Sequence, residues 1–404
     1  MAPAERAVKL SALQRFRRYV VHRLGLESYL VQPGDGRRRP QISARDLLWS
    51  LLAGALLREC SSRAIEALVR SPARAALGVR RGFGDDALAY FTQRLDPAPT
   101  RRALARALRQ AKRNKAFEGS RWIGLSVDGS GAGRSVAAHC GLCHPRHNAQ
   151  GELRDHLHHL TAVSVVGTGL SLPCDLEPFG PADSEQRAGE RALKRVVEAL
   201  GRRFADYVVV DAGFANAAFM DQAGALGLRV VARLKDNLPS LYQAAQARFA
   251  AQAPTILFES GRDRVEVWDA DDFDPWEKLR WLTVRVVRYR QHHPDNSMHE
   301  AYWLTDWPIA QVGPRALFAM AKSRWEIENQ GFNDAKNRYG LEHVRHHHAN
   351  SLEIEWLLVS LVLTLERLYR QRYLHRGTHP RRAAIDLVRA FRLSLAAPLV
   401  HDTS

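Results

Sequence analysis

Two short apolar runs that each end in an aspartate constrain the fold more than any other feature of this sequence. "WIGLSVDGSG" covers residues 122–131 and "YVVVDAGFAN" covers residues 207–216. Short apolar runs bounded by small residues are typical of buried strands. Further strands and helices alternate with them. We therefore predict an α/β fold with a mixed sheet and helices on its faces.

The remaining elements follow from periodicity and from helix start signals. Residues 159–179 read as two strands joined by a glycine turn, and residues 183–204 as a helix that opens on Asp183, with Gln186 in capping-box position. A helix at 216–226 and a strand at 228–236 come next. Residues 254–306 contain several strand-like segments and indicate a β-rich insertion. Helices are expected again at 308–338, 350–373 and 380–396.

The first part of the chain is expected to be helical throughout. Apolar residues recur at helical spacing in 43–57, 60–70 and 98–115, and arginines cluster between these segments. A basic helical domain favours DNA binding, with a solvated charged face as the alternative. The predicted domains are a helical DNA-binding domain (1–118), a catalytic domain (119–372, with the β-rich insertion at about 237–307) and a helical tail (373–404).

Charge indicates a polyanionic partner. The chain has 59 Lys and Arg against 43 Asp and Glu, a net charge of +16, and each phosphate contact releases counterions. Four cysteines are too few for a disulfide scaffold, so a cytoplasmic location is expected. The apolar runs 47–57 and 356–365 are too short to span a bilayer, and no membrane partner is expected. The sequence contains no glycine-rich phosphate-binding motif, so the use of ATP is not indicated.

Three carboxylates form the predicted site. Asp128 and Asp211 each follow a buried strand, and they meet at one edge of the sheet if the strands are parallel neighbours. A turn or a helix cap is the alternative for each. In "RWEIENQGFNDAK" (324–336), Glu328 falls in the apolar stripe, whereas Glu326 lies roughly 200° away and is expected to face solvent. An ion pair between Arg324 and Glu328 is the alternative role.

Oxygen ligands of this kind hold Mg²⁺ or Mn²⁺. Two such ions can clamp the attacking and leaving oxygens of a phosphoryl displacement. A basic protein with a carboxylate cluster on an α/β sheet is therefore expected to be a metal-dependent nuclease or strand-transfer enzyme.

Three stretches also resemble those of DDE transposases of bacterial insertion sequences. "VDGSG", "YVVVDAGFANAAFM" and "RWEIENQGFNDAK" are similar to the three motifs of the insertion-sequence-four-like group, to which the transposon-five transposase belongs. The resemblance spans roughly residues 120–370. It implies a ribonuclease-H-like catalytic domain with a β-rich insertion. It also implies two Mg²⁺ (or Mn²⁺) ions on Asp128, Asp211 and Glu328, and a DNA phosphate on Arg324.

The resemblance also implies further DNA contacts. Arg233 and Lys235 match a strand end near bound DNA, and Trp303, or its neighbour Tyr302, matches an aromatic that stacks on a flipped base. A tryptophan packed in a strand is the alternative. Two positions depart from the pattern: the motif tyrosine is Ala321, and the motif lysine is one place late, at Lys336.

The reaction implied is cleavage and strand transfer at insertion-sequence ends, of the cut-and-paste type. The partners are terminal inverted repeats, target DNA and a second copy of the chain in the DNA complex, in the cytoplasm and on the nucleoid. Two alternatives stay open. One is a non-catalytic DNA-binding protein derived from a transposase, and the other is a ribonuclease-H-like nuclease without strand transfer.

A cysteine pair offers a second, structural site. Cys140 and Cys143 form C-x₂-C, half of a zinc site, but the other two ligands are not evident from the sequence. His139, His156, His158 and His159 are candidates, and a plain loop with two reduced thiols is the alternative. The histidines of "RHHHAN" (345–350) are interpreted as phosphate contacts rather than metal ligands, with a solvated loop as the alternative.

Overall fold

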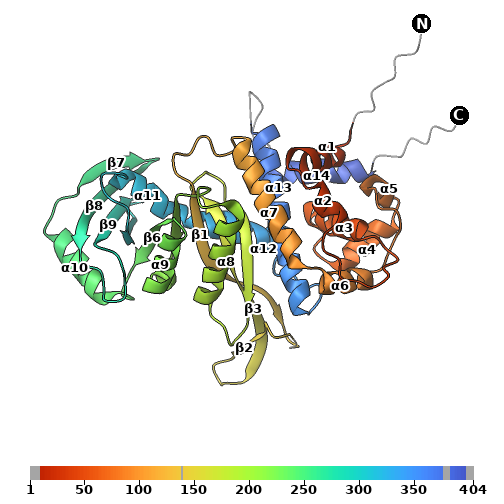
Figure 1. The fold of residues 1–404 in the computed structure, drawn as a ribbon, viewed down its shortest axis with the longest axis horizontal. Helices are drawn as coiled ribbons and strands as arrows, with labels where there is room; N and C mark the ends of the chain where they lie inside the picture. The colour runs from red at the N-terminus through yellow and green to blue at the C-terminus, as the bar shows by residue number, and fades with distance from the viewer. Residues whose placement is uncertain (1–9, 138–139, 376–382, 397–404) are drawn as a thin grey trace, which may run out of the picture. The chain divides into compact units, whose positions relative to one another are not determined.

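The computed structural model describes residues 10–137, 140–375 and 383–396, which Figure 1 shows as a ribbon. The chain divides into two compact units. Unit 1 comprises residues 1–116, 132–157 and 335–404, and unit 2 comprises residues 117–131 and 158–334. His139, named above as a candidate ligand, lies outside the described residues, as do residues 1–9 at the start of the predicted DNA-binding domain.

The strands form one mixed sheet, as predicted. They are β1 (Gly124–Ser135), β2 (His144–His147), β3 (Leu153–Val166), β4 (Leu172–Phe179), β5 (Tyr207–Val210), β6 (Arg229–Leu234), β7 (Ile256–Ser260), β8 (Asp263–Phe273), β9 (Val284–His292) and β10 (Met298–Thr305). The order is β2-β3-β1-β5-β6-β10-β9-β8-β7, with β4 paired to β3. β1, β5 and β6 run parallel, whereas β6–β10 and β10–β9 are antiparallel. The strands of the predicted insertion therefore extend the same sheet.

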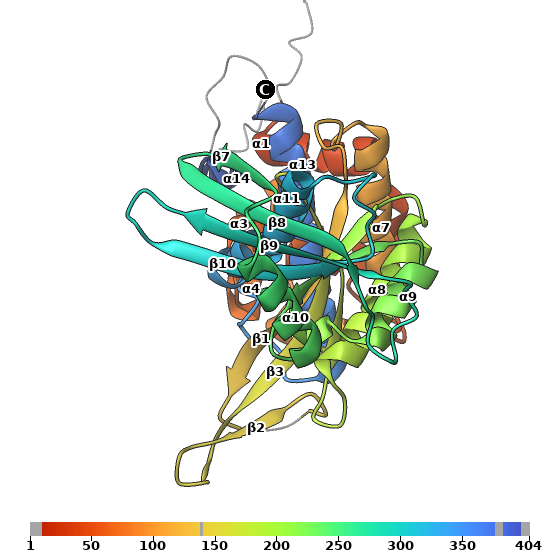
Figure 2. The ribbon, with the colours of Figure 1, turned by 90° about the vertical axis from the view of Figure 1, so that its left-hand side faces the viewer.

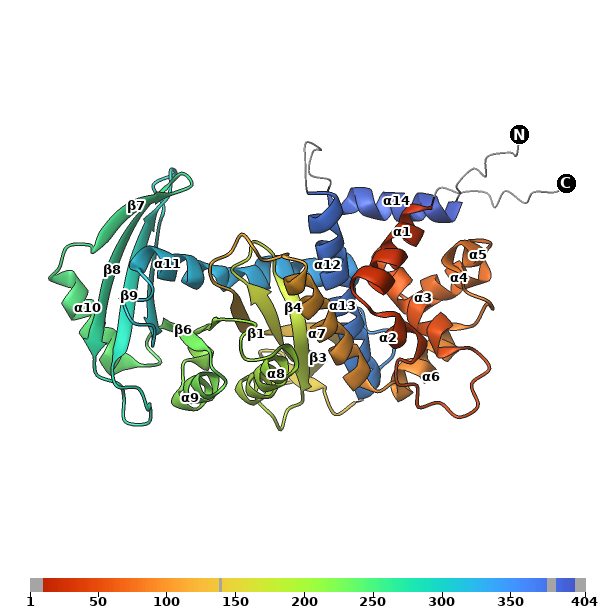
Figure 3. The same ribbon diagram turned by 45° about the horizontal axis from the view of Figure 1, so that its top comes forward.

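Helices of unit 2 cover both faces of this sheet (Figures 2 and 3). They are α8 (Glu185–Leu200), α9 (Ala217–Ala225), α10 (Pro239–Ala250) and α11 (Pro314–Ser323). Alternate residues of each strand face opposite sides. On β10, Tyr302 packs with Phe249 of α10, whereas Trp303 belongs to the same core as Phe318 of α11. The apolar alternation of the strands thus fixes which helix covers which face.

Three local features of unit 2 differ from the sequence predictions. Helix α8 is capped by Ser184, whose side chain accepts from Arg187 N, and Asp183 instead pairs with Arg191. Helix α10 was not predicted, because its apolar periodicity is weak. The predicted helix 308–338 is divided, since a π-helical turn occupies Ile327–Phe332.

Unit 1 is built around one buried helix, α13 (Ala349–Tyr373), which packs against α3 (Ala44–Leu57), α6 (Asp85–Arg94) and α7 (Pro97–Arg113). The other helical elements are α1 (Ala12–Arg18), a π turn (Tyr19–Arg23), α2 (Glu27–Val31), α4 (Ser62–Arg70), α5 (Ala73–Leu77), α12 (Asn333–Tyr339) and α14 (Ala384–Ala396). Both apolar runs, in α3 and α13, are buried, as predicted. No helix of the described residues is long and apolar enough to cross a membrane.

Candidate active site

The carboxyl ends of β1 and β5 bring two aspartates to one edge of the sheet. The strands are parallel with Val127 opposite Val210, so Asp128 and Asp211 occupy the next position of each strand. Side chains at this edge of α/β sheets converge on ligands. Asp128 is only 8% exposed, whereas Asp211 is half-buried. The condition stated for their convergence, that the two strands are parallel neighbours, is therefore met.

Backbone N–H groups orient both aspartates. Asp211 Oδ1 accepts from Gly213 N at 2.9 Å and from Phe214 N at 3.3 Å, which makes Asp211 the cap of a short 3₁₀ turn. Asp128 Oδ1 accepts from Gly129 N at 2.9 Å. Asp211 therefore does act as a helix cap, the alternative role considered for it in the sequence. It uses only Oδ1, so it is compatible with a ligand on Oδ2.

Arg324 joins the third predicted carboxylate to the first. Its Nη1 lies 2.6 Å from Glu328 Oε1 and 3.5 Å from Asp128 Oδ2. The guanidinium is 11% exposed, and the Glu328 side chain is 44% exposed. The ion pair that was the alternative role for Glu328 thus exists, and it extends to Asp128. Glu328 is nevertheless not the core residue that the apolar stripe predicted.

The π turn explains this difference and a second one. A π turn pairs residues five apart, so side chains no longer follow the 3.6-residue period used for the prediction. Glu326 does not face solvent, because its Oε2 accepts from Gly167 N at 3.0 Å. Gln330 Oε1 similarly accepts from Ser171 N at 3.1 Å. These two side chains fix the π turn to the loop between β3 and β4 and so position Glu328.

The site concentrates negative charge. The pKa of Asp128 is raised to about 7. Burial is the main cause, the Arg324 guanidinium opposes it, and the Glu328 and Asp211 carboxylates add to the rise. Like charges that share a low-dielectric site disfavour ionisation, and a nearby cation relieves this. The Glu328 and Asp211 carboxylates therefore both act electrostatically on Asp128.

Sequence reasoning missed a fourth carboxylate, Glu185 in the first turn of α8. A Cβ built on Gly129 would come 2.3 Å from Glu185 Cδ, so the carboxylate rests against the backbone next to Asp128. Burial raises the pKa of Glu185, and the charge of Asp211 raises it further, whereas a hydrogen bond from Gly129 N lowers it. A glutamate in the first turn is common in any helix. The one available signal was the glycine directly after Asp128.

The donor types are those that a divalent cation prefers, although among the described residues only Cys140, Cys143, His158 and His347 already lie close enough together to hold a metal ion. Asp128, Asp211, Glu328 and Glu185 offer carboxylate oxygens from four separate elements, and hard cations such as Mg²⁺ prefer such oxygens. The buried side chain of Arg324 pairs with two of these carboxylates, Asp128 and Glu328. Additional positive charge at this edge of the sheet would relieve the repulsion that raises the pKa of Asp128.

The predicted DNA-contacting residues of unit 2 differ in their exposure to solvent. Lys235 is exposed, as a phosphate contact requires. Arg233 is half-buried, lies 5.6 Å from the ring centroid of Trp303 and donates to Glu300 O. Trp303 is 2% exposed and belongs to the core, with its ring centroid 6.1 Å from that of Trp325. This is the packed tryptophan given as the alternative, so Trp303 offers no face to a base.

The remaining predicted residues belong to unit 1. Lys336 lies on α12, and its Nζ is 3.2 Å from Glu342 Oε1. Cys140 and Cys143 lie in the turn before β2, with their sulfurs 3.8 Å apart. Cys143 also contacts His347, one of the histidines interpreted above as phosphate contacts.

The chain matches a known protein family. The family model described as "Transposase DDE domain" matches residues 144–365, more than half of the chain. The chain therefore belongs to the DDE-domain transposases. The match includes Asp211 and Glu328 and begins after Asp128.

A cryo-EM structure of the piggyBac transposase synaptic complex with hairpin DNA is similar over 96% of this chain and 80% of that chain, with 10% identity and a TM-score of 0.49. No curated protein matches the chain.

Proposed function

We propose that this chain is a metal-dependent, cut-and-paste DNA transposase of the insertion-sequence-four-like group, with a ribonuclease-H-like catalytic domain. The observation that carries the proposal is the convergence of Asp128, Asp211 and Glu328 at the carboxyl edge of parallel strands, in a chain of the DDE family. Residues 119–372 form the proposed catalytic domain, residues 1–118 a DNA-binding domain and residues 373–404 a tail.

In the proposed reaction, water attacks the phosphorus at an element end, the P–O3′ bond breaks, and the 3′ oxygen leaves as a hydroxyl. That hydroxyl then attacks a phosphorus of the opposite strand or of target DNA, forming a new P–O3′ bond and displacing the 3′ oxygen of the attacked strand as a hydroxyl. Two Mg²⁺ or Mn²⁺ ions, when bound, would activate the attacking oxygen and stabilise the leaving one. Asp128, Asp211 and Glu328 would hold them, and the backbone bonds to Asp128 and Asp211 keep these carboxylates oriented.

The proposed DNA contacts are basic side chains. Arg324 binds a phosphate at the element end, and Lys235, Arg233 and Lys336 contribute to the basic surface. The net charge of +16 supports a long DNA path. Two element ends are brought together in transposition, so a homodimer in the DNA complex is part of the proposal.

The direct test is cleavage of DNA that carries the sequences flanking the gene, with Mg²⁺, Mn²⁺ or neither. We expect nicking at the element ends and joined products only when a metal is present. Nicking without end specificity or joining would instead indicate a nuclease. DNA binding without cutting in either metal would indicate the non-catalytic binder.

The affinity of the site for metal is expected to depend on pH. The folded, metal-free protein raises the pKa of Asp128 from its ordinary value of 3.8 to about 7, mainly through burial. The carboxyl is then protonated below this pH and must lose the proton to bind a cation. Mn²⁺ affinity, measured by calorimetry, should rise from about pH 6 and level off above about pH 8. Asp128→Asn should bind more weakly and lose this dependence. A pH-independent wild type would contradict the assignment.

Glu185 is expected to support the metal site. Glu185→Gln keeps the shape of the side chain against Gly129 but removes its charge. We expect Mn²⁺ affinity and cleavage to fall about 10–100-fold, as for groups that orient metal ligands. Glu198→Gln changes an exposed glutamate on the same helix and should have no effect. Equal behaviour of the two variants would exclude Glu185 from the site.

A further inference from the structure

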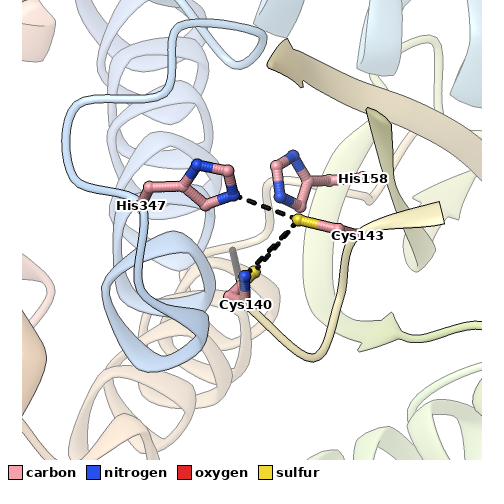
Figure 4. Close-up of side chains that lie close together, drawn as sticks. All are labelled: Cys140, Cys143, His158 and His347. Carbon is pink, nitrogen blue, oxygen red and sulfur yellow. Dashed lines mark hydrogen bonds between the residues drawn. The ribbon is translucent and has the colours of Figure 1, made fainter. Parts of the chain in front are cut away.

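Two thiols and two imidazoles gather at the turn before β2. Cys140, Cys143, His158 and His347 each place one ligand atom within 4.8 Å of the others. The two sulfurs are 3.8 Å apart, and Cys143 Sγ is 3.1 Å from His347 Nε2. In Figure 4 the four side chains point toward a common centre. None of the four cysteines, all of which the structure describes, forms a disulfide.

The sulfur–sulfur distance is that of a tetrahedral zinc site. Zinc binds thiolate sulfur at about 2.3 Å, and two such ligands at the tetrahedral angle are about 3.8 Å apart. Two sulfurs and two nitrogens form a common structural zinc donor set. Harder cations such as Mg²⁺ prefer oxygen, which none of the four ligand atoms supplies.

A turn and a strand pairing position three of the ligands, Cys140, Cys143 and His158. Cys143 N donates to Cys140 O at 3.1 Å, which closes the turn that holds both thiols. β2 and β3 pair with His144 opposite Leu157, so continuing the register sets Cys143 across from His158. His158 follows directly on the part of β3 that belongs to unit 1, and its side chain is fully buried.

The fourth ligand comes from a distant part of unit 1. One residue separates His347 from α13, namely His348, which occupies the N-cap position of that helix. Other contacts hold this segment in place: Asn350 donates to Thr92 O, Gln93 O and Leu95 O, and His346 Nδ1 lies 2.9 Å from Ser351 Oγ. The position of His347 therefore does not depend on the two thiols.

We propose that Cys140, Cys143, His158 and His347 bind one zinc ion, which joins the β2–β3 hairpin to the start of α13. The role is structural, because four protein ligands leave no open position for a substrate. The proposal does not rest on the catalytic function, since the zinc site and the carboxylate site share no residue.

The test is metal analysis of the full-length chain without DNA. The protein is purified with a histidine-free tag under reducing conditions and without chelator. We expect one zinc per chain by mass spectrometry, and cobalt substitution should give the absorption bands of a tetrahedral thiolate site. Cys143→Ser and His347→Gln should lose the zinc. Cys60→Ser, at a half-buried cysteine outside the cluster, and Asp128→Asn, in the carboxylate site, should keep it.

A chelator provides a test that requires no variant to fold. Removing zinc from the wild type should lower its melting temperature, and adding zinc back should restore it. Zinc at background level after reconstitution in reducing buffer would overturn the proposal. An unchanged zinc content in both Cys143→Ser and His347→Gln would overturn it too.

Discussion

Glu328→Gln is expected to reduce cleavage of element-end DNA by about 10³-fold or more. The exchange preserves the shape of the side chain but removes an anionic metal ligand. Metal ions contribute several kcal/mol to such transition states, and each 1.36 kcal/mol is about tenfold in rate. The measurement is the single-turnover rate in Mg²⁺, with DNA binding measured in parallel to show that the variant still folds and engages DNA.

Glu326→Gln is the matched control, two residues away. The amide oxygen can still accept the hydrogen bond from Gly167 N, so the anchor of the π turn is retained. We expect its rate to stay within about threefold of wild type, less than 1 kcal/mol. If Glu328→Gln cuts as fast as Glu326→Gln, then Glu328 serves only the ion pair with Arg324, and the third metal ligand is another residue.

Asp269→Ala is expected to destabilise the protein by about 3–5 kcal/mol, the cost of leaving a buried charge without its partner. Asp269 and Arg285 are 1% and 2% exposed and form a two-pronged ion pair. The same guanidinium donates to Trp307 O at 2.9 Å and to Val312 O at 2.8 Å. Those carbonyls lie in the segment that enters α11, so the pair also holds the start of the helix leading to Arg324.

Urea unfolding followed by tryptophan fluorescence provides the measurement. Asp272→Ala is the control on the same strand, because Asp272 is 59% exposed and pairs with an Arg248 that is 44% exposed. Such surface pairs contribute about 0–1 kcal/mol. A loss below about 1 kcal/mol for Asp269→Ala would show that the interior solvates Arg285 without this carboxylate.

The sheet and its two aspartates could be predicted because strand signals are local. Buried runs that end in Asp128 and Asp211 identify strands, and parallel pairing then brings both side chains to one edge. The orientation of Glu326 and Glu328 could not be predicted in this way. It depends on a π turn, which changes the period on which the prediction rested.

Other parts of the sites depend on contacts that are distant in sequence. Glu185 reaches Gly129 only because α8 packs over β1, and nothing in the helix sequence indicates this. His347 is 204 residues from Cys143. The sequence therefore indicated only the cysteine pair of the proposed zinc site. Trp303 was assigned to DNA by resemblance, whereas its alternation on β10 directs it to the core.

Arg324 has a thermodynamic consequence. In the metal-free protein its guanidinium neutralises Glu328 and lies near Asp128. Under the function proposed above, a DNA phosphate that attracts the same guanidinium would leave both carboxylates more available to cations, and DNA would strengthen metal binding. By reciprocity, metal would then strengthen DNA binding by the same factor. One arginine would thus couple the two equilibria.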